Sequence, residues 1–321
     1  MNRVMYKLLL ALFAFACVEQ ADAAQRGGLV LQFDDGWTEW RTELAPELER
    51  VGGRATVFVN NRYIASGRIT LDDLRALQDE YGWEIGSHTV NHHNAPRFVR
   101  QHGLDAWLKQ EFDASVDELR AAGLNVRSLV FPFNDSTREI EEAVLKKVES
   151  FRRADRLAIA PGMRPDGSLP ATSIDSTRYT PLPVMKQWVD MAQRRNELLL
   201  LYGHRVLPDS AFITGRVVEV SPQELTVDVD VELQPGEEYA LVPNTGRRVA
   251  SSEPFRVAGV ERRTIRVDGG DLTRVTEPGA EFLMGPSYGT RLSEFREFIE
   301  YAATKLRFFT VSEVVDGKHR E

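Results

Sequence analysis

The chain has 321 residues, of which 42% are hydrophobic and 27% are charged. This is enough to bury a large core in one domain, or in one domain with a smaller companion. Its formal net charge of −8 at pH 7 argues against a nucleic-acid-binding protein, because phosphate backbones attract basic surfaces.

The first 23 residues are typical of a secretory signal peptide. A short positive region with Arg3 and Lys7 precedes an apolar run at residues 8–18, which is short for a membrane-spanning helix. An A-x-A cleavage site follows at residues 21–23. We therefore expect export, to the periplasm or the medium, and no transmembrane segment in the mature chain. A lipid anchor at Cys17 is the less favoured alternative.

Cys17 is the only cysteine, so the mature chain would contain no disulfide and no thiolate metal ligand. Any metal site must then be built from histidine, aspartate and glutamate. The chain has only six histidines, which makes their positions informative.

From residue 28 to residue 202, strand patterns alternate with helical patterns. The predicted strands are residues 28–33, 55–59, 83–87, 128–131 and 198–202, and the predicted helices are residues 39–50, 71–80, 104–122, 137–149 and 182–196. This alternation predicts parallel strands joined by crossover helices. A closed barrel and an open sheet both fit it.

Helical periodicity disappears between residues 208 and 285. Short runs rich in β-branched residues replace it, separated by turn sequences, at residues 212–220, 225–231, 239–242, 255–260 and 264–267. A helix at residues 292–306 and a strand at residues 308–311 follow. The sequence therefore predicts an all-β domain at residues 208–285, inserted into an α/β domain that comprises residues 27–207 and 286–321.

The residues that can do chemistry follow predicted strands, at the edge where α/β barrels and open α/β sheets place their sites. Asp34 and Asp35 end the first strand, and two adjacent carboxylates are costly unless a cation or hydrogen bonds accommodate them. His88 and His92 follow a later strand. Residues four apart lie on one face of a helical turn, close enough to share a metal ion. His204 ends another strand.

Taken together, these motifs resemble the polysaccharide deacetylase family, the NodB-homology carbohydrate esterases. Residues 32–36 (QFDDG) are similar to the family's T-F-D-D-G motif, and residues 86–92 (GSHTVNH) are similar to its G-S-H-[ST]-x-x-H motif. Residues 200–204 (LLYGH) are similar to the family's late strand, which ends in leucines and a histidine. The resemblance covers residues 27–207 and 286–321.

This resemblance implies a distorted or incomplete (β/α) barrel and a hydrolase that removes acetyl groups from an extracytoplasmic or extracellular polysaccharide, N-acetyl groups being favoured over O-acetyl groups. It implies one divalent metal ion held by Asp35, His88 and His92. It makes Asp34 the general base and His204 the general acid. Two histidines and one aspartate suit zinc, cobalt, nickel or manganese, and we expect zinc.

The family's third motif is similar to the turn after residue 131. Here the resemblance assigns the oxyanion contact to Pro132 and Phe133, through the Phe133 N–H group. Many members carry an arginine that braces the base, but the corresponding position is Val130. We therefore expect Arg178 or Asp175 to provide this brace.

Two other functions fit the same residues. One is a non-catalytic sugar-binding protein on this fold, although such a protein needs no general base. The other is a metal-dependent amidohydrolase acting on an amide that is not a sugar. The inserted domain either contributes to substrate binding or serves as a structural or docking module for an unidentified partner. Its aromatic residues look like core residues rather than an exposed row, which favours the second role.

One further motif is typical of a different enzyme class. Residues 285–289 (GPSYG) match the G-x-S-x-G nucleophile elbow of α/β-hydrolases. Only Asp316 and His319 follow it as plausible partners, at a polar terminus. We interpret the motif as a junction back into the main domain.

Overall fold

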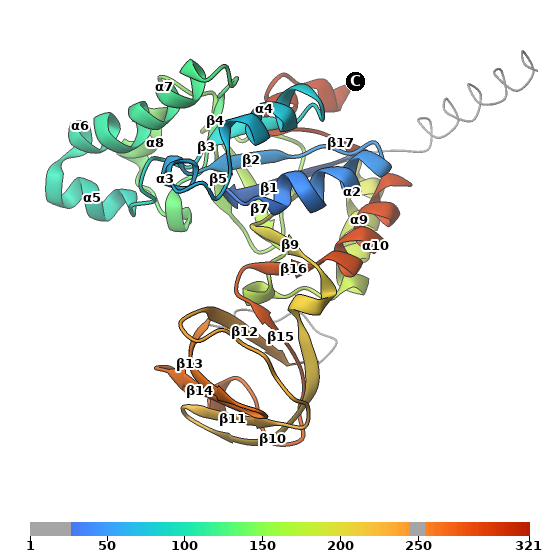
Figure 1. The fold of residues 1–321 in the computed structure, drawn as a ribbon. Helices are drawn as coiled ribbons and strands as arrows, with labels where there is room; N and C mark the ends of the chain where they lie inside the picture. Colours follow the sequence, from blue (N-terminus) through green and yellow to red (C-terminus); the bar gives the residue numbers. More distant parts are fainter. Residues whose placement is uncertain (1–26, 244–253) are drawn as a thin grey trace, which may run out of the picture.

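The structure, a computed structural model, describes residues 27–243 and 254–321 (Figure 1). The expected signal peptide, with Cys17, lies outside these residues, as does most of the segment between the strands predicted at residues 239–242 and 255–260. Figure 1 shows a larger α/β body and, below it, a smaller body made only of β-strands. No helix of the described residues has both the length and the apolar character needed to cross a membrane.

Seven parallel strands close the larger body into a barrel. In barrel order they are β1 (Gly28–Asp35), β2 (Thr56–Val59), β3 (Glu84–Ser87), β4 (Ser128–Leu129), β5 (Ser150–Ala154), β7 (Ser168–Ser173) and β8 (Leu198–Gly203). β8 closes the barrel by pairing with β1 from Gly28↔Leu198 to Phe33↔Gly203.

The barrel is distorted at the edge of β1 that does not pair with β8, because two strands share this edge. β17 (Arg307–Phe308) pairs with the first two residues of β1, and β2 pairs with the last four. On β8, the short antiparallel strand β6 (Ile159–Ala160) likewise shares one edge with β7. The predicted fold class, a distorted α/β barrel, is confirmed.

Alternate residues of each barrel strand face opposite sides, as a pleated strand requires. On β1, Leu29, Leu31 and Phe33 belong to the core between the strands and the helices, whereas Val30 belongs to the core inside the barrel. Gly86 on β3 is needed because a Cβ atom there would lie 2.5 Å from the Phe58 ring. The interior is therefore a packed core rather than a pore.

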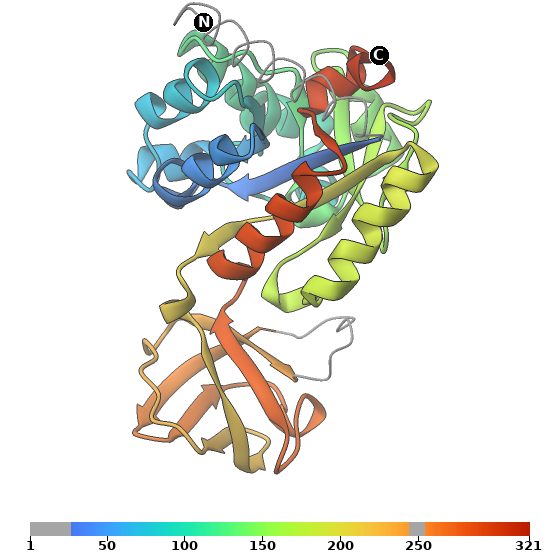
Figure 2. The same ribbon diagram turned by 90° about the vertical axis from the view of Figure 1, so that its right-hand side faces the viewer.

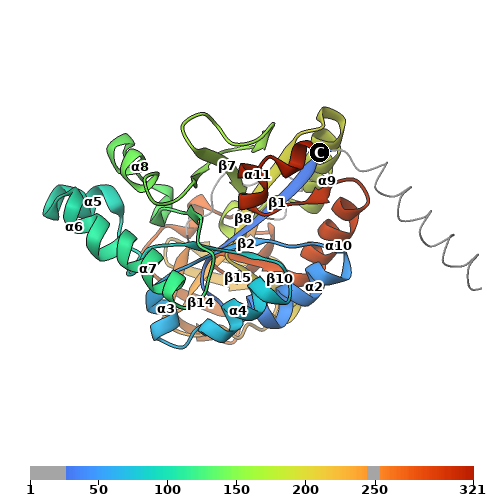
Figure 3. The same ribbon diagram turned by 90° about the horizontal axis from the view of Figure 1, so that it is seen from above.

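Helices surround this barrel, as Figure 3 shows from above. They are α2 (Ala45–Arg50), α3 (Asn61–Ala65), α4 (Leu71–Asp79), α5 (Ala95–His102), α6 (Leu104–Trp107), α7 (Ala114–Ala121), α8 (Arg138–Val144), α9 (Leu182–Arg195) and α10 (Leu292–Ala303). Thr70 is the N-cap of α4 and forms a capping box with Asp73.

The last helix, α11 (Val311–Val315), closes the amino-terminal mouth of the barrel. Its Val311 N–H donates to Thr56 Oγ1 (2.9 Å), and its Ser312 N–H donates to the buried Glu84 carboxylate (2.6 Å). Thr56 and Glu84 are the first residues of β2 and β3. The sequence motifs lie at the opposite, carboxyl-terminal mouth.

The strands β5 and β7 were not predicted from the sequence. β5 contains two consecutive arginines, and β7 is Ser168-Leu169-Pro170-Ala171-Thr172-Ser173, so neither reads as a hydrophobic run. Their burial depends on contacts made inside the barrel. The helix predicted at residues 137–149 also ends early, at Val144.

The smaller body is a closed barrel of six antiparallel strands with the order β10-β11-β14-β13-β12-β15 (Figures 1 and 2). The strands are β10 (Ile213–Ser221), β11 (Glu224–Val227), β12 (Glu238–Pro243), β13 (Phe255–Glu261), β14 (Thr264–Asp268) and β15 (Glu281–Pro286), of which β15 was not predicted. The chain enters by β9 (Arg205–Leu207) and returns by β16 (Gly289–Arg291), and these two strands pair with each other.

This second barrel has a hydrophobic core of its own, which includes Leu225, Leu241, Val257 and Phe282. That separate core agrees with an inserted folding unit. The proposed domain limits at residues 207 and 286 stay a prediction.

Stability measurements can test these limits, because all five tryptophans lie outside residues 208–285. Phe282→Ala empties a buried site of the second barrel, and such changes cost about 3–5 kcal/mol. We expect the variant to lower the unfolding midpoint seen by far-ultraviolet circular dichroism and to leave the tryptophan fluorescence midpoint near that of the wild type. Phe295→Ala, in the main core, should shift the fluorescence midpoint. Coincident shifts in both signals for Phe282→Ala would contradict two separate units.

Candidate active site

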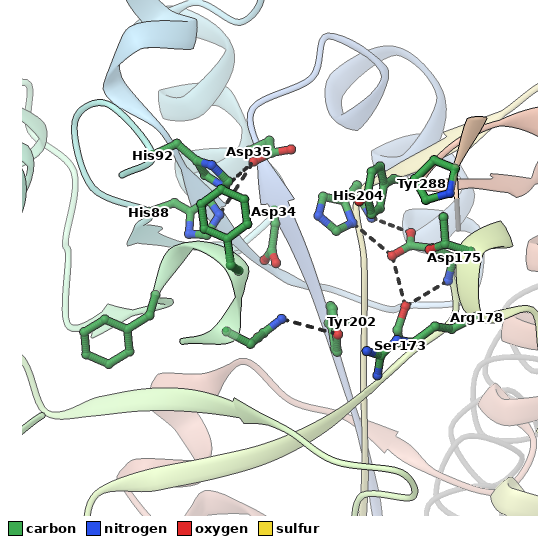
Figure 4. A pocket seen from close by; sticks show the side chains of 15 residues that line it. Asp34, Asp35, His88, His92, Ser173, Asp175, Arg178, Tyr202, His204 and Tyr288 are labelled. Atoms are coloured by element: carbon green, nitrogen blue, oxygen red, sulfur yellow. Dashed lines mark hydrogen bonds and ion pairs between the residues drawn. The ribbon is translucent and has the colours of Figure 1, made fainter. Parts of the chain in front are cut away.

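A pocket of about 410 Å³ opens at the carboxyl-terminal mouth of the main barrel. Asp34 and Asp35 reach it from the end of β1, His88 and His92 from the loop after β3, and His204 from the end of β8. In Figure 4, His88 and His92 lie on one side of the two aspartates, and His204 lies on the other. The structure thus brings together all five residues that the motifs singled out.

Asp35, His88 and His92 form a cluster whose geometry fits one metal ion. Asp35 Oδ1 lies 3.6 Å from His88 Nε2 and 3.5 Å from His92 Nε2, and the three ligand atoms lie within 4.8 Å of one another. Two atoms that each lie about 2.1 Å from a tetrahedral ion are about 3.4 Å apart. Asp35 Oδ1 is buried without a hydrogen bond in the described part of the chain, as an oxygen intended for a cation would be.

The protonation of the two imidazoles also suits metal binding. His88 Nδ1 lies 2.8 Å from the Val130 carbonyl oxygen, which can only accept a hydrogen bond. Nδ1 therefore carries the proton, and the Nε2 lone pair of the neutral ring is left toward Asp35. Burial lowers the pKa values of His88 and His92 to about 4. Both rings are therefore neutral at pH 7, as metal ligands must be.

The two histidines do not lie on a helical turn, so the helical geometry predicted for them is wrong. Residues 88–94 form a loop between β3 and α5, and His92 itself has a left-handed backbone with φ 60°. The rings still meet edge to face, 4.8 Å apart. The loop conformation, rather than helical spacing, places them together.

Asp34 forms a buried bidentate ion pair with Arg152 of β5. Arg152 Nη1 donates to Asp34 Oδ1 at 2.8 Å and Nη2 donates to Oδ2, and both side chains are almost completely buried. Burial alone would raise the pKa of Asp34, but the charge and hydrogen bonds of Arg152 lower it below its usual value. Asp34 is therefore an ionised carboxylate at neutral pH.

The brace of Asp34 was thus assigned to the wrong residues. Neither Arg178 nor Asp175 contacts Asp34, although both line the pocket. Arg152 does so because it occupies an interior position of the unpredicted strand β5. Asn134 Oδ1 accepts hydrogen bonds from the same guanidinium (3.1 and 3.3 Å), which also stacks 4.0 Å from the centre of the Tyr202 ring.

Asp175 instead holds His204. Its Oδ2 lies 2.9 Å from His204 Nδ1, and its Oδ1 accepts from the His204 backbone N–H at 3.0 Å. Ser173 Oγ donates to the same carboxylate at 3.0 Å. Burial lowers the pKa of His204, but Asp175, with help from Asp34 and Asp35, outweighs it and raises the pKa to about 9. His204 is therefore protonated at neutral pH.

Of the two residues assigned to the oxyanion contact, only one lines the pocket. Phe133 lines the pocket, whereas Pro132 is buried and does not line it. Phe133 has φ 63° and ψ 9°, and its ring lies 4.8 Å from that of His92. Asn134 also has a positive φ, 52°, which asparagine tolerates better than most residues.

Two residues of the site were missed in the sequence: Arg152, which contacts Asp34, and Tyr288, which lines the pocket. The signal for Arg152 was weak, since it depended on recognising Ser150–Ala154 as a strand. Tyr288 comes from the G-x-S-x-G motif, between β15 and β16. Ser287 of that motif donates to the Glu238 carbonyl oxygen and has no histidine partner among the described residues, which agrees with the junction interpretation.

The comparisons with known proteins agree with this arrangement. Residues 22–152 match the family model described as Polysaccharide deacetylase. Over this segment the chain is therefore similar to the polysaccharide deacetylase family. The match supports a hydrolase of the polysaccharide deacetylase type. The matched segment includes Asp34, Asp35, His88, His92 and Arg152.

Among solved structures, the chain is similar to a family 4 carbohydrate esterase from Streptomyces lividans in complex with acetate, at 19% identity and a TM-score of 0.42 over 56% of this chain and 80% of that one. It is similar to the peptidoglycan deacetylase PdaC from Bacillus subtilis at 18% identity and a TM-score of 0.36, over 56% and 75%. The BpsB deacetylase domain from Bordetella bronchiseptica matches at 16% identity and a TM-score of 0.38, over 50% and 82%. None of the curated proteins compared with the chain matches it.

The metal cluster generates a direct prediction. We expect purified protein to bind about one divalent ion per chain, because two neutral imidazoles and one carboxylate converge. A His88→Ala, His92→Ala double variant should lose it, as measured by elemental analysis after dialysis. His93→Ala is the matched control, since His93 pairs with Glu111 instead (2.9 Å). Full metal content in the double variant would contradict the site.

Proposed function

We propose that the protein is a metal-dependent hydrolase, expected to use zinc, that removes acetyl groups from a polysaccharide outside the cytoplasm. One observation supports this proposal above the others. A three-residue metal cluster and a protonated histidine face the same pocket from opposite sides, with an ionised aspartate between them. Together they can supply an electrophile, a general base and a general acid, three functions that accelerate the hydrolysis of an acetyl group.

Asp35, His88 and His92 would hold the ion, and the pocket would receive the acetyl group beside them. A divalent ion bound there supplies a Lewis acid, which polarises an acyl carbonyl and makes water more acidic. The unpaired Asp35 oxygen and the two neutral imidazoles offer one donor atom each. Three protein ligands leave coordination positions for water and substrate.

Asp34 would act as the general base. It lies next to the ligand Asp35 in the chain, and Arg152 holds it ionised and in one orientation. A carboxylate fixed in this way can accept the proton of the attacking water as the water adds to the carbonyl carbon. Arg152 would serve as the positioning residue for this base.

His204 would act as the general acid. Asp175 fixes the ring through Nδ1, so Nε2 is left to donate a proton. An amine leaves the tetrahedral intermediate only after it gains a proton, and this requirement is stronger than for an alcohol. The raised pKa of His204 therefore favours N-acetyl groups as substrates.

The Phe133 N–H would complete the site by donating to the carbonyl oxygen as negative charge develops there. Phe133 lies in the turn that follows β4 and lines the pocket. The left-handed backbone at this residue changes the direction of its N–H relative to an extended chain. Its exposed ring lies against His92, on the metal-cluster side of the pocket.

Acetate release tests the proposed function. We expect the protein to liberate acetate from at least one glycan in a panel of chitin oligomers, peptidoglycan and O-acetylated polysaccharides, and a chelator should abolish this activity. Asp34→Asn should lower the turnover rate by about 10²–10⁴-fold while metal content stays near that of the wild type. Asp155→Asn, at a partly exposed aspartate paired with Arg164, is the control. Chelator-resistant release, or full turnover by Asp34→Asn, would refute the mechanism.

The pH profile tests the acid. Because His204 must be protonated to donate, turnover of an N-acetyl substrate should fall as pH rises through the pKa of His204. Asp175→Asn removes the charge that raises this pKa, so the alkaline limb should move to lower pH by roughly 1–3 units. Asp166→Asn, whose carboxylate pairs with Arg153 at the surface, should not move it. An unmoved limb in Asp175→Asn would remove His204 from the role of acid.

A further inference from the structure

Two exposed aromatic side chains lie in the same pocket. Among the described residues, four large hydrophobic side chains are exposed: Phe133 (65%), Val218 (48%), Tyr288 (40%) and Leu157 (37%). Phe133 and Tyr288 both line the pocket of the main barrel. The other two do not.

The two rings stand at opposite ends of the catalytic groups. The Phe133 ring lies 4.8 Å from that of His92, and the Tyr288 ring lies 4.9 Å from that of His204. Figure 4 shows Tyr288 beside His204, across the two aspartates from His92. A substrate whose acetyl group lies between His92 and His204 would therefore have an aromatic ring on each side.

Both residues have an unfavourable backbone conformation. Phe133 has φ 63° and Tyr288 has φ 62°, a left-handed conformation that bulky residues rarely adopt. Eight non-glycine residues of the described chain have a positive φ, and five of them line this pocket. Backbone strain concentrated in this way is typical of a binding site rather than of a packing accident.

The junction after the second barrel fixes the position of Tyr288. The preceding Ser287 N–H donates to the Glu238 carbonyl (3.0 Å), and the Tyr288 carbonyl accepts from the Arg205 N–H (3.2 Å). Gly285 is needed here, because a Cβ atom would lie 2.1 Å from the Phe212 ring. The residues of the G-x-S-x-G motif therefore position a tyrosine, not a serine nucleophile.

The Tyr288 hydroxyl forms no hydrogen bond within residues 27–243 and 254–321. An aromatic face together with an unpaired hydroxyl suits a ligand that has both an apolar face and polar edges. A pyranose ring has this character, with C–H groups on its faces and hydroxyl groups around its rim.

We propose that Tyr288 is a substrate-positioning residue that binds a pyranose ring of the glycan opposite Phe133, and so makes the site selective for acetylated sugars over simple acetyl esters. This inference rests on the proposed function. It also assigns a role in substrate selection to the segment by which the chain returns from the second barrel.

Tyr288→Ala and Tyr288→Phe test this role on two substrates, a tetramer of N-acetylglucosamine and an aryl acetate without a sugar. We expect Tyr288→Ala to lower kcat/KM for the tetramer about tenfold, mainly through KM, and to lower it at least threefold less for the aryl acetate. Tyr288→Phe should recover most of the tetramer activity, because it keeps the ring. Val218→Ala, on the second barrel, is the control for loss of an exposed side chain and should match the wild type.

A binding measurement separates this inference from the proposed function, since it needs no turnover. Calorimetric titration with the glucosamine tetramer, which carries no acetyl group, should show binding to the wild type and to Val218→Ala, and about tenfold weaker binding to Tyr288→Ala. Equal affinities in Tyr288→Ala and the wild type, equal losses on both substrates, or no binding of the tetramer by the wild type would overturn the role of Tyr288. Absence of acetate release from every glycan, with the binding difference intact, would overturn the proposed function alone.

Discussion

The buried ion pair between Asp34 and Arg152 is the constraint on which the site depends. Both side chains are almost completely inaccessible to water, and removing a charge from water costs several kcal/mol for each ion. The bidentate geometry offsets this cost, and Asn134 satisfies further guanidinium N–H groups. The two partners come from β1 and β5, which are not neighbours in the sheet, so the pair joins separate strands of the barrel. The catalytic mouth is thus assembled by the fold as a unit, and loss of either partner would leave an unpaired buried charge.

This pair also explains how two adjacent carboxylates can have opposite properties. Arg152 lowers the pKa of Asp34, whereas burial raises the pKa of Asp35, whose Oδ1 has no hydrogen bond in the described residues. Alternation along β1 turns the two side chains away from each other, one toward Arg152 and one toward His88 and His92. A cation would stabilise the buried Asp35 carboxylate beside the two neutral histidines. Asp34 does not need one, because Arg152 already neutralises its charge. Separate environments therefore give the neighbours separate roles, as base and as ligand.

Strand alternation made much of this site predictable. Asp34 is in phase with Val30 on β1, and His204 is in phase with Tyr202 on β8, so the sequence places both at the barrel mouth once the strands are recognised. Arg152 could not be found in the same way. Two adjacent arginines read as an exposed segment, and only the closed barrel shows that one of them faces Asp34. The left-handed backbone of His92 could not be predicted from the sequence either, because no sequence pattern requires it. Local periodicity predicts which face a residue takes, whereas partners from distant strands decide what it does there.

The position of the second barrel follows from the same geometry. The chain leaves the main barrel directly after His204, through β9, and returns through β16, which pairs with β9 residue by residue from Gly289↔Arg205 to Arg291↔Leu207. Because exit and return are hydrogen-bonded to each other, a whole barrel fits between them without disturbing β8. The same pairing brings the residue before β16 next to the residue before β9. Those two residues are Tyr288 and His204, so an insertion at this point of the fold adds a side chain to the catalytic pocket as a consequence of strand register.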